Sequence, residues 1–463
     1  MDLSSALSVA AAIRAKQVSP LEVLDACLAR VDETNDRVNA VIWRDDEAHR
    51  AAAREAGEVV ARGADLGPFH GVPIPIKDLT PVQGWPTTFG SYGAPAGPSP
   101  EDELVVAGLR RAGFVLAGRT NTPEFGPITV AENLRYGPTR NPWDLDRTPG
   151  GSSGGAAAAV AAGMFPLAHA NDGGGSIRIP ASCCGLVGLK PSRGRIPGLV
   201  TAWEGAVVEG VLTRTVADAA AVLDVLGIPD PLCWYNAPVP GRPYAQEVGA
   251  DPGHLRIGVV EQAPMGLPLD PACLQAVRST ATALADLGHD VRVVPLDIPD
   301  DALGAFLAMV NSGLADFLEV DWSRTEPHIQ ANRATAQGVD SLSYVAAVHT
   351  LQRFSRREVA RWGREFDVLL TPTLSILPPP VGLLAEIHAA PDSPNFTVFQ
   401  MAVFNAFFNV TGQPGISLPV HVSPDGLPVG VQLVGGPWQE DLLVRLASQL
   451  EVALPWADRR PEL

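Results

Sequence analysis

The sequence is short of basic residues and has no long hydrophobic run. Its 463 residues include 34 Lys and Arg against 51 Asp and Glu, which gives a formal net charge of −17. Because contacts to phosphate need clustered Lys and Arg, this balance argues against unaided binding to nucleic acid or to an anionic membrane. No stretch approaches the roughly 18 consecutive apolar residues of a membrane-spanning helix. We therefore expect no nucleic-acid partner and no membrane association.

Cysteine is scarce, and its pattern indicates no pairing. The five cysteines are odd in number and irregularly spaced, without a C-x-x-C motif: Cys27, Cys183, Cys184, Cys233 and Cys273. Such a set argues against a disulfide framework and against a zinc site, and it suits a reducing compartment. Asp2 stands where a signal peptide carries positive charge, so residues 1–17 predict a short surface helix. We expect a cytoplasmic protein with no metal and no cofactor.

The chain also lacks internal repeats, low-complexity tracts and an obvious linker. Its length alone would suggest two or three domains. The loop-rich segment 228–253 is the one candidate boundary, and we interpret it as a long surface connection. With 46% hydrophobic and 18% charged residues, the composition is that of a globular protein. We expect a single domain over residues 1–463.

Short apolar strands alternate with helical segments along the chain. Segment 18–35 shows a clear helix start, because Ser19 can cap, Pro20 takes the first helical position and Glu22 completes a capping box. Strands are expected at 38–43, 71–79, 114–120, 255–260, 290–296, 415–420 and 426–435, and helices at 45–63, 102–113, 214–227, 271–288 and 440–454. This alternation predicts an α/β fold with a large, mixed but mostly parallel sheet, covered by helices on both faces.

The tract "TPGGSSGGAAAAVAAG" (148–163) allows three interpretations. It could be a Gly/Ser linker, although the alanine run that follows is strongly helix-forming. It also satisfies G-x-S-x-G with Ser153 at the centre, but a nucleophile elbow needs a preceding strand, and residues 139–149 are polar and proline-rich. That interpretation would also need a late histidine, for which the candidates are His349, His388 and His421.

The third interpretation combines this tract with "NDGGGSIRIP" (171–180) and with Lys77. Ser152 and Ser176 lie 24 residues apart, and Lys77 ends the apolar segment 71–79. Three glycines before Ser176 could direct several backbone N–H groups toward one point, as an oxyanion hole requires. A lysine buried in an apolar strand favours its neutral form and could act as a base. A Ser-His-Asp triad through His169 is a weaker alternative.

Taken together, these segments resemble the amidase signature family, whose members use a Ser–cis-Ser–Lys triad. The resemblance runs from "GPFHGVPIPIKD" through "GGSSGG", "NDGGGSIRIPAS" and "GLVGLKPSRGRIP" to "NVTGQPGISLPV" and "GLPVGVQLVG". Within the family, "AHANDGGGSIRIPAS" and the closing "ALPWADRRPEL" look most like hydrolases of nylon cyclic dimers. The resemblance implies the amidase signature fold, with a catalytic core over about 65–215 and a variable substrate-pocket region over about 228–400.

The resemblance also implies a role for each matching residue. Ser176 would be the nucleophile, Ser152 the bridging serine after a cis peptide bond from Gly151, and Lys77 the base. The N–H groups of Gly173, Gly174, Gly175 and Ser176 would stabilise the oxyanion, although the family usually has an aliphatic residue where Gly173 stands. Ser153 would hydrogen-bond the lysine, and Asp172 and Arg178 would form an ion pair that braces the loop. Gly126 would contact substrate, and Asp78, next to Lys77, is expected to cap the end of the strand rather than to act as an acid catalyst.

We therefore expect a hydrolase that cleaves C–N bonds of small non-peptide amides through an acyl-enzyme. Anilides, esters, carbamates and nylon oligomers suit the same chemistry. Pocket residues are expected within 125–136, 199–210, 306–322 and 399–409, whose apolar content favours an uncharged acyl or aryl group. The alternatives are the amidase subunit of a tRNA-dependent amidotransferase, a Ser-His-Asp esterase and a non-catalytic binding protein. The resemblance also suggests a homodimer.

Overall fold

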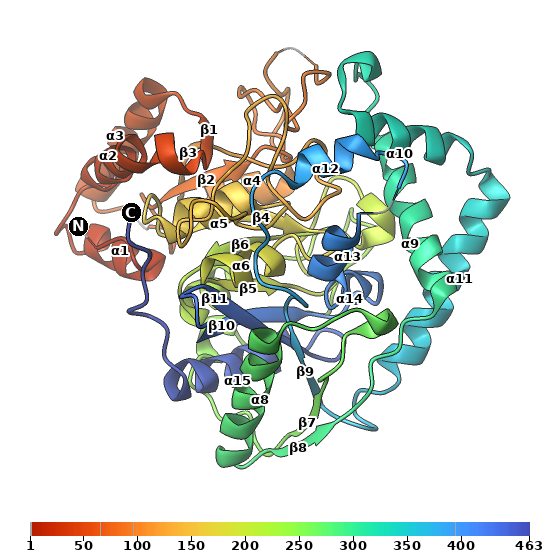
Figure 1. Ribbon diagram of the computed structural model, residues 1–463. Helices are drawn as coiled ribbons and strands as arrows, with labels where there is room; N and C mark the ends of the chain where they lie inside the picture. Colours follow the sequence, from red (N-terminus) through yellow and green to blue (C-terminus); the bar gives the residue numbers. More distant parts are fainter. Residues whose placement is uncertain (1, 65, 96, 394) are drawn as a thin grey trace.

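The computed structural model describes residues 2–64, 66–95, 97–393 and 395–463, so residue 65, where the expected core begins, lies outside it. The described residues form two β-sheets and the helices that surround them (Figure 1). The strands are β1 (Val41–Trp43), β2 (Pro73–Lys77), β3 (Val115–Thr120), β4 (Ala168–Asp172), β5 (Val187–Lys190), β6 (Val208–Thr213), β7 (Arg256–Val259), β8 (Asp290–Val293), β9 (Val368–Pro372), β10 (Gly415–Val422) and β11 (Pro428–Val434).

The helices follow the expected segments closely and add several in the second half of the chain. They are α1 (Ala6–Arg14), α2 (Pro20–Val38), α3 (Asp46–Ala61), α4 (Leu104–Arg111), α5 (Gly154–Ala161), α6 (Arg178–Cys184), α7 (Val216–Leu226), α8 (Pro271–Asp286), α9 (Asp300–Ser312), α10 (Pro327–Gln337), α11 (Ser341–Val359), α12 (Leu383–Ala389), α13 (Phe396–Ala402), α14 (Ala406–Val410) and α15 (Glu440–Ala453). Short 3₁₀ turns include η1 (Ala202–Gly205) and η4 (Gly313–Asp316). The capping box predicted at Ser19 and Glu22 is present.

The large sheet has the strand order β4-β6-β5-β10-β11-β9-β7-β8. The expected α/β class and mixed sheet are confirmed, but the expectation of mostly parallel pairing is wrong. Among the described strands of this large sheet, only the pairs β9–β7 and β7–β8 are parallel, and the other five adjacent pairs are antiparallel. Strand β6 lies between β4 and β5, which α6 connects, and the β10–β11 hairpin occupies the middle of the sheet. Alternating helices and strands do not reveal such inserted antiparallel strands.

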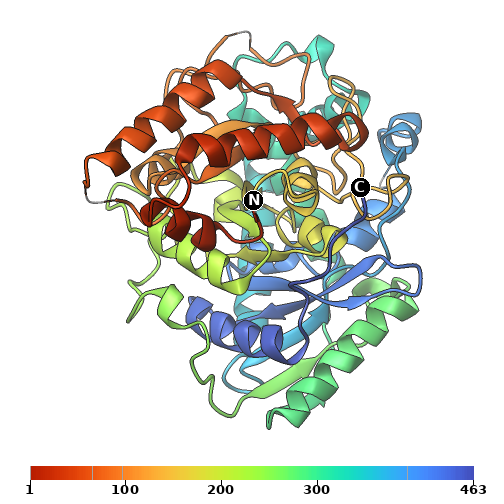
Figure 2. The same ribbon diagram turned by 90° about the vertical axis from the view of Figure 1, so that its left-hand side faces the viewer.

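Helices cover both faces of the large sheet, as expected. Leu370 and Leu433 point to one face, where they join a cluster with residues of α7, α8 and α15. Their neighbours Leu369 and Val434 point to the opposite face and pack with Phe404 and with Phe408 of α14. Because side chains alternate across a strand, consecutive apolar residues predict a strand buried on both sides. Figure 1 shows this sheet running from β4 at the centre to β8 at the bottom, with α8 and α15 beside its lower strands, and Figure 2 shows the same arrangement turned by 90°.

Helix α5 joins the two sheets. All eight of its residues, "GGAAAAVA", are buried. Ala156 and Ala157 pack toward the large sheet with Ala168 and Ala170 of β4, while Ala158 and Ala159 pack toward β3 and α2. Small side chains on all sides let the helix approach both layers closely. The three-stranded sheet, in the order β1-β3-β2, thereby holds the end of β2 close to β4.

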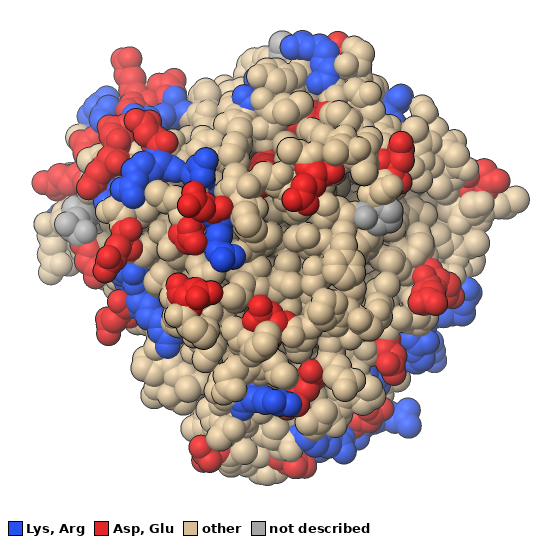
Figure 3. All heavy atoms as spheres, in the orientation of Figure 1, with Lys and Arg blue, Asp and Glu red and all other residues tan. Residues whose placement is uncertain are grey.

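The surface carries mixed charge. On the face shown in Figure 3, Lys and Arg lie among Asp and Glu, and the centre of the face is mostly uncharged. No helix among the described residues is long and apolar enough to cross a membrane. Helices α9, α10 and α11 form the outer wall at the right of Figure 1, and both termini lie on the opposite side of the molecule.

Candidate active site

Lys77, the last residue of β2, ends in the protein interior. Its Nζ lies 2.7 Å from Ser152 Oγ and 2.7 Å from Oδ1 of Asn171. Burial lowers the pKa of Lys77 to about 7, against the opposing influence of the Glu209 and Asp172 carboxylates. A substantial fraction of the neutral amine is therefore present near neutral pH, and a neutral amine can accept a proton.

Ser152 connects Lys77 to Ser176. Its Oγ lies 2.9 Å from Ser176 Oγ, and the Gly151–Ser152 peptide bond is cis, as the resemblance implied. The backbone N–H of Ser153 donates to the Ser176 carbonyl (3.3 Å), which ties the two glycine-serine segments together. An unbroken chain of hydrogen bonds thus runs from an amine through one hydroxyl to a second hydroxyl. Such a chain can move a proton away from Ser176.

The glycine loop before Ser176 requires one correction. The N–H of Gly175 donates to Oδ1 of Asp172 (2.7 Å), so it is already used and cannot serve as an oxyanion donor as expected. Within the part of the chain that the structure describes, the N–H groups of Gly173, Gly174 and Ser176 have no protein acceptor. Three backbone N–H groups therefore remain available to stabilise an oxyanion, instead of the four that were expected.

The predicted Asp172–Arg178 ion pair is present and fully buried. Arg178 contacts both carboxylate oxygens of Asp172, at 2.9 and 3.0 Å. Burial raises the pKa of Asp172, but the Arg178 guanidinium outweighs it and holds this pKa well below its usual range. Arg178 also donates to Gln432 on β11, and Asn409 of α14 donates to Asp172. The loop is thus fixed to the large sheet by charge-assisted hydrogen bonds.

The expected hydrogen bond between Ser153 and the lysine is not the arrangement found. The Ser153 hydroxyl donates to the backbone carbonyl of Asn171 (3.2 Å), and the Asn171 side chain takes the place beside Nζ. Asn171 was not among the predicted site residues. The available signal was the alternation along β4, which places Asn171 on the same face as His169.

His169 and Ser153 do not support a Ser-His-Asp triad or a nucleophile elbow. His169 Nε2 lies 2.8 Å from Oε2 of Glu209, and Nδ1 accepts the Lys77 backbone N–H (3.4 Å). Both ring nitrogens are therefore engaged away from Ser176. Ser153 is fully buried at the start of α5, where its hydroxyl is not exposed to substrate. Asp78 accepts three hydrogen bonds from Thr88 and Gly90, so its side chain holds the loop at residues 88–90.

Trp203 explains why glycine replaces the usual aliphatic residue at position 173. A Cβ on Gly173 would lie 2.6 Å from the Trp203 ring, and a Cβ on Gly313 would lie 2.3 Å from its Nε1. The indole therefore needs glycine on both sides. Trp203 itself has a left-handed backbone (φ 52°), an uncommon conformation for a bulky residue. This packing could not be predicted locally, because residues 173, 203 and 313 are far apart along the chain.

Two cavities meet at Ser176. The first, here called the acidic cavity, has a volume of about 350 Å³, and Glu103, Glu209 and Asp316 are among its lining residues. The second, the apolar cavity, has a volume of about 300 Å³, and its walls include Phe306, Phe399 and Phe407. The two cavities share these lining residues: Gly126, Pro127, Ser176, Trp203 and Val310. All four segments predicted to form the pocket contribute residues.

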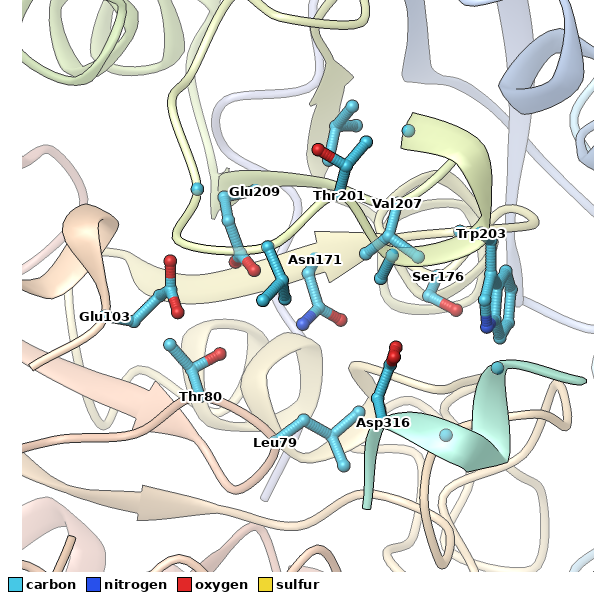
Figure 4. A pocket seen from close by; sticks show the side chains of 18 of the residues that line it. Leu79, Thr80, Glu103, Asn171, Ser176, Thr201, Trp203, Val207, Glu209 and Asp316 are labelled. Atoms are coloured by element: carbon cyan, nitrogen blue, oxygen red, sulfur yellow. The ribbon is translucent and has the colours of Figure 1, made fainter. Parts of the chain in front are cut away.

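The acidic cavity brings carboxylates and the predicted nucleophile into one space. Figure 4 shows Glu103, Glu209 and Asp316 around the space that Asn171 and Ser176 also border. Burial raises the pKa of Glu103 and of Asp316. Gly126, predicted to contact substrate, has φ 82°, and a Cβ there would lie 2.7 Å from Leu79 and 3.5 Å from Ser152 Oγ. The site therefore has little room for a side chain at position 126.

Comparison with known proteins gives a consistent result over nearly the whole chain. The family model "Amidase" matches residues 22–444. A 6-aminohexanoate-cyclic-dimer hydrolase from Paenarthrobacter ureafaciens is 41% identical, over 97% of this chain and 95% of that protein. An acylamidase from Rhodococcus erythropolis is 33% identical, over 99% and 97%. A solved structure of a 6-aminohexanoate cyclic dimer hydrolase with substrate has a TM-score of 0.91 and 38% identity, over 100% of this chain and 99% of that one.

The pKa of Lys77 predicts a pH dependence. Because the neutral amine is the form that accepts a proton, kcat/KM for a non-ionising anilide should rise with pH through about 7 and then level off. Lys190 is also buried, and its pKa is also lowered to about 7, so the Lys190→Gln variant serves as the control and should keep this limb. A profile that is flat between about pH 6 and 9, or a limb lost in Lys190→Gln, would contradict the assignment.

The two adjacent serines should behave differently. Ser152→Ala breaks the hydrogen-bonded chain and should lower kcat by roughly 10²- to 10⁴-fold, the usual contribution of proton transfer by a positioned group. Ser153→Ala removes only a hydrogen bond to the Asn171 carbonyl, so it should lower kcat much less. Steady-state kinetics on both purified variants, with circular dichroism to check folding, decides the point. Equal losses would mean that the tract acts only structurally.

Proposed function

Since this chain belongs to the amidase family, hydrolases that act on carbon–nitrogen bonds, we propose that it hydrolyses small non-peptide amides through an acyl-enzyme on Ser176. The observation that carries the proposal is the hydrogen-bonded chain from Lys77 Nζ through Ser152 Oγ to Ser176 Oγ. No metal or cofactor enters the scheme.

In the acylation step, neutral Lys77 accepts the Ser152 hydroxyl proton while Ser152 accepts the proton of Ser176. The Ser176 oxygen bonds to the amide carbon, and the carbonyl oxygen takes the negative charge. The N–H groups of Gly173, Gly174 and Ser176 stabilise that charge. Losing one such donor typically raises the activation free energy by roughly 3 kcal/mol.

The tetrahedral intermediate then collapses and breaks the C–N bond. The departing nitrogen receives a proton from Ser152, which is reprotonated by Lys77. This leaves an ester on Ser176, a neutral Lys77 and a free amine. Water attacks the ester through the same relay, so that the acid is released and the Ser176 hydroxyl is restored.

The cavities support a small, partly apolar substrate. Their volumes, about 350 and 300 Å³, are typical of small-molecule sites. The aromatic walls of the apolar cavity favour an aliphatic or aryl group. The carboxylates of the acidic cavity favour the amine-bearing part, which becomes cationic after release. The cyclic dimer of 6-aminohexanoate, simple anilides and aryl or alkyl carbamates are the substrates that fit this division.

We propose further that the enzyme works alone in the cytoplasm. All five cysteines are free, and four of them are buried, an arrangement that suits a reducing compartment. An amidotransferase subunit would need partner chains and ATP, so hydrolysis by the purified chain without either distinguishes the two functions. A homodimer stays a prediction.

The nucleophile can be tested directly. The wild-type chain should hydrolyse the cyclic 6-aminohexanoate dimer or a p-nitroanilide and should react with a fluorophosphonate probe. Ser176→Ala and Lys77→Ala should each lower kcat by at least roughly 10³-fold, because each removes a member of the relay. Peptide mapping of the labelled wild-type protein should place the probe on Ser176. Full activity in a pure Ser176→Ala preparation would rule the scheme out.

Trp203 should control which substrates are accepted. Trp203→Ala removes a wall that both cavities share, so kcat/KM for a bulky aryl amide should rise about 10-fold relative to acetanilide. Trp234→Ala is a matched control, because Trp234 is 87% exposed and lines neither cavity within the described residues. An unchanged preference in Trp203→Ala, or equal changes in both variants, would contradict this role.

A further inference from the structure

A cluster of metal-ligating side chains lies outside the two cavities. Glu326 immediately precedes α10, His328 is in the first turn of α10, and His388 is in α12. Their donor atoms lie close together: His388 Nε2 is 3.2 Å from both His328 Nδ1 and Glu326 Oε2, and the latter two atoms are 3.5 Å apart. The sequence did not suggest this group, because His388 lies 60 residues beyond His328.

These separations match the edges of a tetrahedral metal site. With zinc–nitrogen and zinc–oxygen bonds of about 2.0–2.2 Å, two ligands at the tetrahedral angle lie about 3.4 Å apart. The ring centroids of His328 and His388 are 5.3 Å apart while the two nitrogens are only 3.2 Å apart. The rings therefore approach each other through these nitrogens, as two ligands of one ion do.

Hydrogen bonds alone satisfy the group poorly. One ring nitrogen carries either one proton or one lone pair in the ring plane. His388 Nε2 can therefore make only one good hydrogen bond, although both Glu326 Oε2 and His328 Nδ1 lie within reach. An ion at the centre would contact all three atoms at once.

The surroundings suit a cation. The side chains of Glu326 and His328 are only 3% and 2% exposed, and no Lys or Arg in the described part of the chain forms an ion pair with Glu326. A buried carboxylate without a cationic partner is costly. His388, at 16% exposure, gives access from solvent.

The carboxylate is also held in place for ligation. Glu326 Oε1 accepts the N–H of Leu134 (2.6 Å), which leaves Oε2 facing the histidines. The Glu326 N–H donates to Oε2 of Glu124. Such outer hydrogen bonds orient the ligands of metal sites. Glu132 accepts N–H groups of Gly382 and Leu384 and so fixes the start of α12 to the same loop.

From this geometry we propose that Glu326, His328 and His388 bind one divalent transition-metal ion, zinc in the first instance, as a structural clamp. Two imidazoles and one carboxylate are a donor set that zinc accepts, with water as the fourth ligand. The clamp joins α10 and α12 to the loop 121–136. That loop contributes Phe125 and Gly126 to the cavities, and α10 contributes Asn332. The ion would therefore hold one wall of the substrate site.

The test uses the untagged full-length chain, stripped with a chelator and titrated with ZnCl₂ by isothermal calorimetry against a competing chelator of known affinity. We expect one zinc per chain with micromolar or tighter affinity and an increase in melting temperature. His388→Ala and Glu326→Gln should each weaken binding at least 100-fold and abolish the thermal shift. Glu326→Gln keeps the side-chain shape, so it remains informative if His388→Ala fails to fold.

His349→Ala is the matched control, because His349 is exposed on α11 and outside the cluster. It should bind zinc like the wild type. The proposal is overturned if the stripped wild-type chain binds no zinc in this range, or if His388→Ala and Glu326→Gln bind it as tightly as His349→Ala does. Hydrolysis of the amide substrate is measured separately. A failure of the metal-site proposal can therefore be distinguished from a failure of the proposed amide hydrolysis.

Discussion

The chemistry of the candidate active site depends on one buried amine, that of Lys77. Lys77 ends a strand in the interior, where burial lowers its pKa to about 7 and where its two hydrogen-bond partners, Ser152 and Asn171, are both uncharged. A lysine paired directly with a carboxylate would remain cationic. The two carboxylates that raise the pKa of Lys77 form other contacts, since Asp172 pairs with Arg178 and Glu209 contacts His169. The amine can therefore exchange a proton at neutral pH.

The fold supplies the distances that this amine needs. Lys77 comes from the small sheet, Ser176 from the loop after β4 of the large sheet, and Ser152 from the turn that enters α5. Helix α5 has only small side chains and so brings the two sheets together. The buried Asp172–Arg178 pair then fixes the loop against β11 and α14. The glycine-serine tract is thus neither a linker nor an elbow, and it presents the middle hydroxyl of the chain.

Much of this arrangement was accessible from the sequence. The capping box at the start of α2 and most strands followed from local patterns, and the residues Lys77, Ser152 and Ser176 followed from these patterns together with the family resemblance. What could not be predicted depends on contacts between distant segments. The position of β6 between β4 and β5, the Trp203 ring between Gly173 and Gly313, and the Glu326–His328–His388 cluster leave no local trace. The loss of the Gly175 N–H as an oxyanion donor could not be predicted either, because it depends on the hydrogen bond from this N–H to the Asp172 side chain.

The most direct test of the account is the ionisation of Lys77 in the folded enzyme. The chain has only three lysines, Lys16, Lys77 and Lys190, so isotope-labelled lysine side chains can be followed individually by NMR, with Lys77→Ala and Lys190→Gln assigning the signals. The account predicts that Lys77 titrates near pH 7, in the same range as the rise in kcat/KM. A Lys77 signal that stays cationic throughout the active pH range would contradict it.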